Sequence, residues 1–432
     1  MFDTPMKTQH NADAHEALHY HSREPRGKIA TQVTKPMATP HDLALAYSPG
    51  VAYPVLAIAD DRREVNCYTN RANRVAIVTN GTAVLGLGDR GPEAAKPVME
   101  GKCMLLKGLA DVDAIDLEVN ERDPDRLADL ILALEPSFGA VILEDVKSPD
   151  CFYIEHKLND HLSIPLLHDD QHGTAVVCGA AVINGLKITG KRIEELQVVI
   201  CGAGAAAIGC AQLLVAMGLP LDHLVMVDSL GVITRDRPLL SDQKRHYATA
   251  RKLSSLAEAM VGADLCIGVS TGGLITPEMV ARMADRPMLF ALANPTPELP
   301  PHLRQVCRAD MIYATGLSDQ PNQVNNVLGF PYILRGALDI EARRINEVMR
   351  MAAAHALAAL AEEEVTDAVR SRYPHEQLRF GPDYLLPKAL DERLLECVAS
   401  AVAEAAVRSG EARLSIDDWD RYRDRLRSRV LL

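Results

Sequence analysis

The sequence predicts an α/β protein in which helices cover parallel β-sheets. Short apolar runs at 140–143, 162–167 and 196–201 are typical of buried strands, and helix-like segments lie between them. A length of 432 residues suggests more than one domain, and we place the domains at 1–165 and 166–432. We expect an N-terminal α/β domain, followed by a second α/β domain that ends in a helical extension.

Composition excludes several classes of protein. The formal net charge is −12, which argues against a nucleic-acid backbone as partner. No run approaches the ~18 apolar residues of a membrane span, and the N-terminus lacks the basic-then-apolar pattern of a signal peptide. The nine cysteines contain no C-x-x-C pair, and several lie in apolar runs, as in reduced proteins. We expect a cytoplasmic protein with no nucleic-acid or membrane partner.

The N-terminal domain carries two candidate residues. Pro49 and Gly50 stop a helix-like run and place Tyr47 beside a turn. Lys96 stands one residue before Pro97, in an otherwise apolar neighbourhood at the start of a predicted helix. A lysine among apolar groups has a lowered pKa and can act as a base. The alternatives are a packing tyrosine with a wet hydroxyl and an ordinary surface lysine.

Two predicted strands end in pairs of acidic residues. The run 140–143 is followed by Glu144 and Asp145, and the run 162–167 leads into His168, Asp169 and Asp170. Strands that end in acidic pairs can direct up to four carboxylates to one place, where like charges raise one another's pKa unless a cation lies between them. Hard divalent cations such as Mg²⁺ or Mn²⁺ take oxygen ligands of this kind. The alternative for either pair alone is a solvated strand end or a helix N-cap.

A dinucleotide-binding pattern follows in the second domain. The strand 196–201 runs into a G-x-G-x-x-A turn and the helix 208–217, and the next strand, 224–227, ends at an acidic residue. This order is typical of a Rossmann-type, doubly wound fold that binds NAD or NADP, with the pyrophosphate at the helix N-terminus and the acid at the adenosine ribose. The candidate coenzyme-binding residues are Gly202, Gly204, Ala205, Ala207, Asp228 and Ser229.

Two asparagines follow later predicted strands. Asn294 comes after the run 288–293, and Asn326 lies in the loop after the run 311–315. Loops at the carboxyl ends of parallel strands bind ligands in open sheets. Both side chains are neutral donors suited to a carboxylate or a carboxamide, and turn formation is the alternative for each.

Taken together, these segments resemble malic enzyme of the bacterial small-subunit type. The matching segments follow the family order: 46–51, 80–88, 96–102, 144–145, 168–174, 293–295 and 325–327. The resemblance extends from about residue 20 to about residue 400. Some bacterial relatives carry a further phosphotransacetylase-like domain after this region, and we expect that domain to be absent from a chain of 432 residues.

The resemblance implies an oxidoreductase that converts L-malate to pyruvate and CO₂ with reduction of NAD or NADP, and that also decarboxylates oxaloacetate. It implies Mg²⁺ or Mn²⁺ on Glu144, Asp145 and Asp170. It further implies a homodimer or larger homo-oligomer. The remaining roles implied are Lys96 as the catalytic lysine, Asp169 as its acidic partner, Tyr47 as the catalytic acid, and Asn294 and Asn326 as contacts to substrate and nicotinamide.

The chemistry of this reaction requires these residue types. Oxidation of a secondary alcohol needs a base for the hydroxyl proton, for which Lys96 is the candidate. Loss of CO₂ leaves an enolate whose charge a divalent cation stabilises as a Lewis acid. The enolate is then protonated at carbon, for which Tyr47 is the candidate.

The coenzyme remains open between NAD and NADP. NADP-linked relatives commonly have a lysine where this sequence has Leu230, which removes one partner for a 2′-phosphate. Asp228 suits a free 2′-hydroxyl, while Ser229 and the nearby cations Arg235, Lys244 and Arg245 could still accommodate a phosphate.

Two other functions remain open. One is a metal-dependent 2-keto acid decarboxylase that uses the nucleotide only structurally, which would decarboxylate oxaloacetate without reducing a coenzyme. The other is a regulatory dinucleotide sensor, whose role would survive the loss of Lys96 or Asp170.

Overall fold

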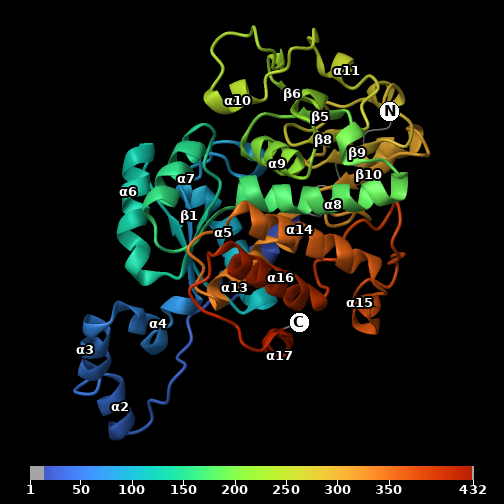
Figure 1. Ribbon diagram of the computed structural model, residues 1–432. Helices are drawn as coiled ribbons and strands as arrows, with labels where there is room; N and C mark the ends of the chain where they lie inside the picture. The colour runs from blue at the N-terminus through green and yellow to red at the C-terminus, as the bar shows by residue number, and fades with distance from the viewer. Residues whose placement is uncertain (1–13, 431–432) are drawn as a thin grey trace.

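The computed structural model describes residues 14–430 and contains two β-sheets covered and joined by helices (Figure 1). This confirms the predicted α/β class. The apolar runs singled out in the sequence form strands whose residues are largely buried, as expected for parallel sheets covered on both faces.

The first sheet has the strand order β2-β1-β3-β4, and every pair in it is parallel. Its strands are β1 (Arg74–Thr79), β2 (Asp113–Glu118), β3 (Ala140–Leu143) and β4 (Leu166–His168). We predict that the second domain begins at residue 166. The strand β4 lies after that boundary, yet it pairs with β3 and belongs to the first sheet. The carboxyl ends of β3 and β4 therefore lie side by side, which brings the two acidic pairs that follow these strands close together.

The second sheet has the strand order β10-β9-β8-β5-β6-β7, in which only β7 is antiparallel. Its strands are β5 (Val198–Cys201), β6 (Leu224–Asp228), β7 (Gly231–Val232), β8 (Leu265–Gly268), β9 (Met288–Ala291) and β10 (Ile312–Thr315). The chain builds outward from β5 in one direction and then returns to build outward from β8 in the other. This reversal confirms the doubly wound fold, and ligands bind where such a reversal occurs.

Helix α5 (Pro92–Ala110) packs against β1 and β2 of the first sheet. It begins with proline after Gly91, whose φ of +84° favours glycine, and it ends at a left-handed Asp111. Its buried face includes Ala95, Met99 and Leu106, at helical spacing. Helices α6 (Pro124–Leu134) and α7 (Asp150–His161) pack on each other beside this sheet.

Helices also surround the second sheet and connect it to the first. Helix α14 contacts both α8 and α16, and α13 contacts both α16 and α5, so the C-terminal helices bind the two sheets into one body (Figure 1). The helices after the first sheet are α8 (Thr174–Thr189), α9 (Ala205–Ala216), α10 (Asp242–His246), α11 (Leu256–Ala259), α12 (Pro277–Ala281), α13 (Phe330–Asp339), α14 (Glu347–Glu362), α15 (Asp367–Arg372), α16 (Arg393–Ser409) and α17 (Trp419–Ser428).

An N-terminal arm extends away from this body (Figure 1). It consists of α2 (Pro40–Ala46), α3 (Ala52–Asp60) and α4 (Val65–Tyr68), and none of these helices has a buried residue. Its large apolar side chains are nevertheless numerous: Leu43, Leu45, Tyr47, Val51, Tyr53, Val55, Leu56 and Tyr68 are all exposed.

Two further observations concern the whole described chain. Within residues 14–430, no helix combines the length and the apolar character that crossing a membrane requires. All nine cysteines fall in this range and are free thiols, most of them buried in the core.

Candidate active site

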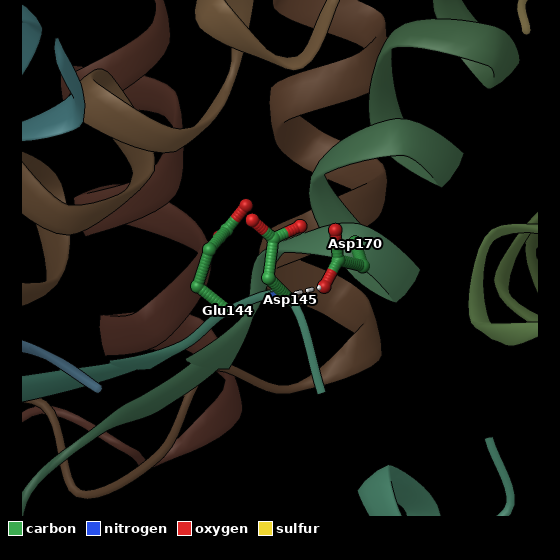
Figure 2. A group of neighbouring side chains, drawn as sticks. All are labelled: Glu144, Asp145 and Asp170. Atoms are coloured by element: carbon green, nitrogen blue, oxygen red, sulfur yellow. Dashed lines mark hydrogen bonds between the residues drawn. The ribbon is translucent and has the colours of Figure 1, made fainter. Parts of the chain in front are cut away.

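A cluster of three carboxylates lies at the edge where β3 and β4 end (Figure 2). Glu144 and Asp145 directly follow β3, and Asp170 lies in η5 (Asp169–Gly173), a π-helical turn that directly follows β4. One oxygen of each carboxylate lies within 4.8 Å of the others. The backbone N–H of Asp145 donates to Asp170 at 2.9 Å, and Asp145 itself has a left-handed φ of +52°. The structure therefore brings together the three residues predicted to bind a metal.

The electrostatics of the cluster suit a divalent cation. Burial, followed by the charge of Asp170, raises the pKa of Asp145 to about 7. Burial also raises the pKa of Glu144 well above its usual range. One oxygen of each of these two side chains is buried and has no hydrogen-bond partner among residues 14–430. Hard cations favour such oxygen ligands, so these residues fit Mg²⁺ or Mn²⁺.

A buried lysine, Lys102, lies beside the cluster. Its Nζ atom is 2.5 Å from Oδ2 of Asp169 and 3.0 Å from Oε1 of Glu144, and it lies 4.5 Å from the ring centre of Phe330. Burial alone would lower the pKa of Lys102, but the charges of Asp169 and Glu144 outweigh it and raise that pKa above its usual range. Asn326 donates a second hydrogen bond to the same oxygen of Asp169, at 2.6 Å.

The structure does not place Lys96 in this site, which corrects the assignment made from the sequence. Its side chain is exposed and lies on a different face of α5, where it binds Asp116 at 2.6 Å and Glu118 at 3.3 Å on β2. Lys102 is six residues further along the same helix, on the face that packs into the core. Lys102 therefore takes the place we predicted for Lys96.

The site opens into a cavity of about 410 Å³ that both sheets line. The segments that follow β3 and β4 contribute the three carboxylates, helix α5 contributes Lys102, and the loops that follow β8 and β9 contribute Ser270 and Asn294, among others. The loop containing Gly86 reaches across so closely that a Cβ there would lie 1.9 Å from the carbonyl oxygen of Asn294. Asn294 and Asn326, both predicted from the sequence, line this cavity.

Tyr47 does not lie in the cavity of its own chain. It forms the C-terminal cap of α2 in the arm, and 71% of its surface is exposed. It is absent from the residues that line the cavity.

The dinucleotide turn lies between β5 and α9 as the sequence predicts. Gly202 has a φ of +132°, and a Cβ there would lie 2.6 Å from the carbonyl oxygen of Val269. Gly204 caps α9, and Ala205 and Ala207 lie in its first turn. The free N–H groups of this helix end form the kind of site that receives a pyrophosphate.

Asp228, at the end of β6, is held by two cations. Its Oδ2 atom accepts hydrogen bonds from Arg237 and Lys244, each at 2.7 Å, and Oδ1 accepts from the backbone of Leu230 at 2.9 Å. Burial alone would raise the pKa of Asp228, but Arg237 and Lys244 lower it to about 2.

Of the cations named from the sequence near this position, only Lys244 contacts Asp228. Arg235 bonds to the carbonyl of Ala248, and Arg245 to that of Leu240. Ser229 is exposed beside Asp228. Sequence reasoning missed Arg237, because nothing in the order of residues shows that the segment after β7 folds back onto the end of β6.

Comparison with known proteins agrees with this arrangement. The sequence matches the family models "Malic enzyme, N-terminal domain" over residues 26–159 and "Malic enzyme, NAD binding domain" over residues 171–377. It is 50% identical to an NADP-dependent malic enzyme of Halomonas elongata over 93% of this chain and 96% of that protein.

Longer relatives match equally well. An NAD-dependent malic enzyme of Rhizobium meliloti and an NADP-dependent malic enzyme of Escherichia coli are each 50% identical over 95% of this chain and 54% of their own length. The chain thus spans about half the length of several curated relatives that it matches.

Solved structures are similar over nearly the whole chain. The malic enzyme from Pyrococcus horikoshii is 35% identical with a TM-score of 0.87, covering 97% of this chain and 96% of that one. The NAD-dependent malic enzyme from Thermotoga maritima is 39% identical with a TM-score of 0.80, covering 91% and 98%. With both family models matched and relatives at half identity, the chain belongs to the malic enzyme family.

Proposed function

We propose that this protein catalyses the oxidative decarboxylation of L-malate to pyruvate and CO₂ with reduction of NAD⁺ or NADP⁺, and that it also decarboxylates oxaloacetate. The observation that carries the proposal is the buried Lys102–Asp169 pair beside three carboxylates, in a cavity that the dinucleotide-binding sheet also lines. One side of the cavity thus offers acid–base and metal-ligating groups, and the other offers the coenzyme site.

In this proposal Lys102 takes the place of Lys96 as the base for the substrate hydroxyl. Asp169 orients its ammonium group, and Asn326 holds Asp169 from the other side. A divalent cation on Glu144, Asp145 and Asp170 would polarise a substrate oxygen as a Lewis acid, and its charge would offset the carboxylates that keep Lys102 protonated. Asn294 faces the same cavity with a neutral amide suited to the substrate carboxylate or the nicotinamide carboxamide.

The coenzyme would lie along the second sheet, with its pyrophosphate at the start of α9. Gly202 and Gly204 let the backbone approach it, and Asp228 with Arg237 and Lys244 would face its adenosine ribose. The relatives at half identity are named for either NAD or NADP. The cation pair at Asp228 favours NADP in this chain.

We further propose that the protein acts as a cytoplasmic homodimer or larger homo-oligomer, in which Tyr47 serves the cavity of a partner copy. The arm helices α2 and α3 carry several large exposed apolar side chains and bury none. An apolar surface of this kind marks a contact with another chain. A second copy covering the arm would bring Tyr47, the candidate acid that protonates the enolate carbon, next to a cavity that its own chain leaves without a tyrosine.

The test is the initial rate of NADH and NADPH formation from L-malate with Mn²⁺, with and without EDTA, together with an assay for pyruvate. We expect metal-dependent reduction of a coenzyme with equal amounts of pyruvate. Decarboxylation of oxaloacetate without any coenzyme reduction from malate would instead identify a decarboxylase. Absence of both reactions in folded, metal-loaded protein would leave the dinucleotide sensor.

A further inference from the structure

A single carboxylate, that of Glu155 on α7, contacts the histidines at the two ends of the turn η5. Its Oε1 atom is 2.5 Å from Nε2 of His172, and its Oε2 atom is 3.4 Å from Nδ1 of His168. His168 caps the start of the turn, and His172 lies near its end. Glu155 therefore bonds both ends of a five-residue turn whose first two residues are Asp169 and Asp170.

His168 links Glu155 to the carboxylate cluster. The ring of His168 lies between Glu155 and Asp170, with Nε2 4.0 Å from Oδ2 of Asp170. His168 is fully buried, and Nε2 has no hydrogen-bond partner among the described residues. Glu155 therefore fixes the position of the His168 ring, and the ring in turn restricts the positions open to the carboxylate of Asp170.

The other sides of the turn are closed by packing. A Cβ at Gly209 of α9 would lie 2.1 Å from the carbonyl oxygen of Gln171, and a Cβ at Gly173 would lie 3.3 Å from the Cβ of Asn326. π-helical turns are rare and occur frequently at functional sites. Within residues 14–430, Glu155 is the side chain that makes polar contacts at both ends of this turn, through His168 and His172.

We propose that Glu155 is a positioning residue for the metal site: by bonding His168 and His172 together, it fixes the direction in which Asp170 presents its carboxylate. The residue does not contact the three carboxylates themselves. It acts through His168, as outer partners orient the ligands of a metal. The proposal rests on the proposed function only in that Glu144, Asp145 and Asp170 bind a divalent cation.

The test is the affinity of the full-length protein for Mn²⁺, measured by electron paramagnetic resonance without substrate or coenzyme. The variant Glu155→Gln keeps the size of the side chain but can accept from only one histidine at a time. We expect its Mn²⁺ dissociation constant to rise about tenfold or more, in line with the loss of outer partners at other metal sites. Circular dichroism, which reports on the fold, is expected to stay as in the wild type.

Glu347→Gln is the matched control. Glu347 lines the same 860 Å³ cavity as Glu155 and His172, carries the same charge, and is exposed with no hydrogen bond to either histidine. We expect its Mn²⁺ affinity to match the wild type. If Glu155→Gln does not fold, His172→Gln removes one of the two contacts and is expected to weaken Mn²⁺ binding by a smaller factor.

The outcomes separate this proposal from the proposed function. Wild-type affinity for Mn²⁺ in folded Glu155→Gln overturns the role of Glu155, even if malate is turned over. An equal loss in the Glu347→Gln control assigns the effect to charge in the cavity and also overturns it. If the wild type binds Mn²⁺ but does not oxidise malate, the proposed function fails while the role of Glu155 is still decided by the same titration.

Discussion

The ammonium group of Lys102 lies 2.5 Å from the carboxylate of Asp169, and both side chains are almost fully removed from solvent. This pair is stabilised by neighbours on each side, because Glu144 contacts the lysine and Asn326 contacts the aspartate. Lys96, which belongs to the same helix, instead binds two acids on the edge strand β2. The two lysines therefore lie in separate environments, one in the cavity and one on the surface.

Replacing Lys102 tests its role as the base. We expect Lys102→Ala to lower kcat for malate oxidation by about 10²–10⁴, the usual contribution of a positioned acid–base group, while Mn²⁺ still binds. Lys96→Ala serves as the control from the same helix and is expected to keep kcat within about twofold, as for most surface changes. A kcat in Lys102→Ala close to that of the wild type would remove Lys102 from the mechanism.

Mixing two inactive variants tests whether Tyr47 serves a partner chain. In a dimer with shared sites, a chain carrying Tyr47→Phe and a chain carrying Lys102→Ala together form one intact site per mixed dimer. Random exchange of subunits in a symmetric dimer would then restore about a quarter of wild-type activity. The measurement is kcat after the two variants are mixed and allowed to exchange, with each variant alone as control. No recovery, despite mixed dimers seen by mass spectrometry, would confine Tyr47 to its own chain.

The raised pKa of Asp145 predicts a pH dependence of metal binding. The pKa is about 7 in the metal-free protein, against 3.8 for an ordinary aspartate, so Asp145 holds a proton below pH 7 that a cation must displace. Mn²⁺ affinity should therefore fall as the pH drops below 7, with more protons released at pH 6 than at pH 8. Calorimetry in buffers of different ionisation enthalpy measures this release, and equal release at both pH values would contradict it.

The same shift predicts how the metal affects thermal stability. Because the folded pKa of Asp145 exceeds the unfolded value, the contribution of its protonated form to stability is lost as the pH rises from about 4 to about 7. A bound cation removes the cost of the buried charge. Mn²⁺ should therefore raise the melting temperature more at pH 8 than at pH 6, and a larger effect at pH 6 would show that another group controls the coupling.

The two cations at Asp228 predict the preference for coenzyme. A lysine ion pair with a 2′-phosphate is a strong, charge-assisted contact, whereas a ribose hydroxyl gains little from it. We expect Lys244→Ala to raise KM for NADP⁺ about tenfold and to leave KM for NAD⁺ within about threefold, because a charge-assisted pair contributes about 1.5–3 kcal/mol. Lys252→Ala, which removes an exposed cation from the loop before α11, is the control. Equal changes for both coenzymes would show that Lys244 does not distinguish them.

The sequence predicts the metal cluster well for a physical reason. Parallel neighbours place their carboxyl ends at one edge, so acidic pairs after two adjacent strands must meet, and Glu144, Asp145 and Asp170 do. The lysine that lies in the cavity also left a signal in the sequence. Lys102 falls on the apolar stripe of α5 with Met99 and Leu106, while Lys96 falls outside it.

Other parts of the site depend on contacts that the order of residues does not contain. The arm that carries Tyr47 makes its position clear only in the folded chain. Its apolar side chains are exposed there, so packing within the chain does not explain its direction. The pairing of Arg237 with Asp228 depends on the path of the segment after β7. We place the start of the second domain at 166, but the strand β4 (Leu166–His168) pairs with β3 and completes the first sheet.

The contact between Gly209 and Gln171 links two parts of the site that would otherwise be separate. Helix α9 starts at the turn that receives the pyrophosphate, and within its second turn it presses on the backbone next to Asp170, with no space for even a methyl group. A shift of this helix on coenzyme binding would therefore displace the turn that carries Asp170, a proposed metal ligand. By thermodynamic reciprocity, the metal must then change the affinity for coenzyme by the same factor as the coenzyme changes the affinity for metal.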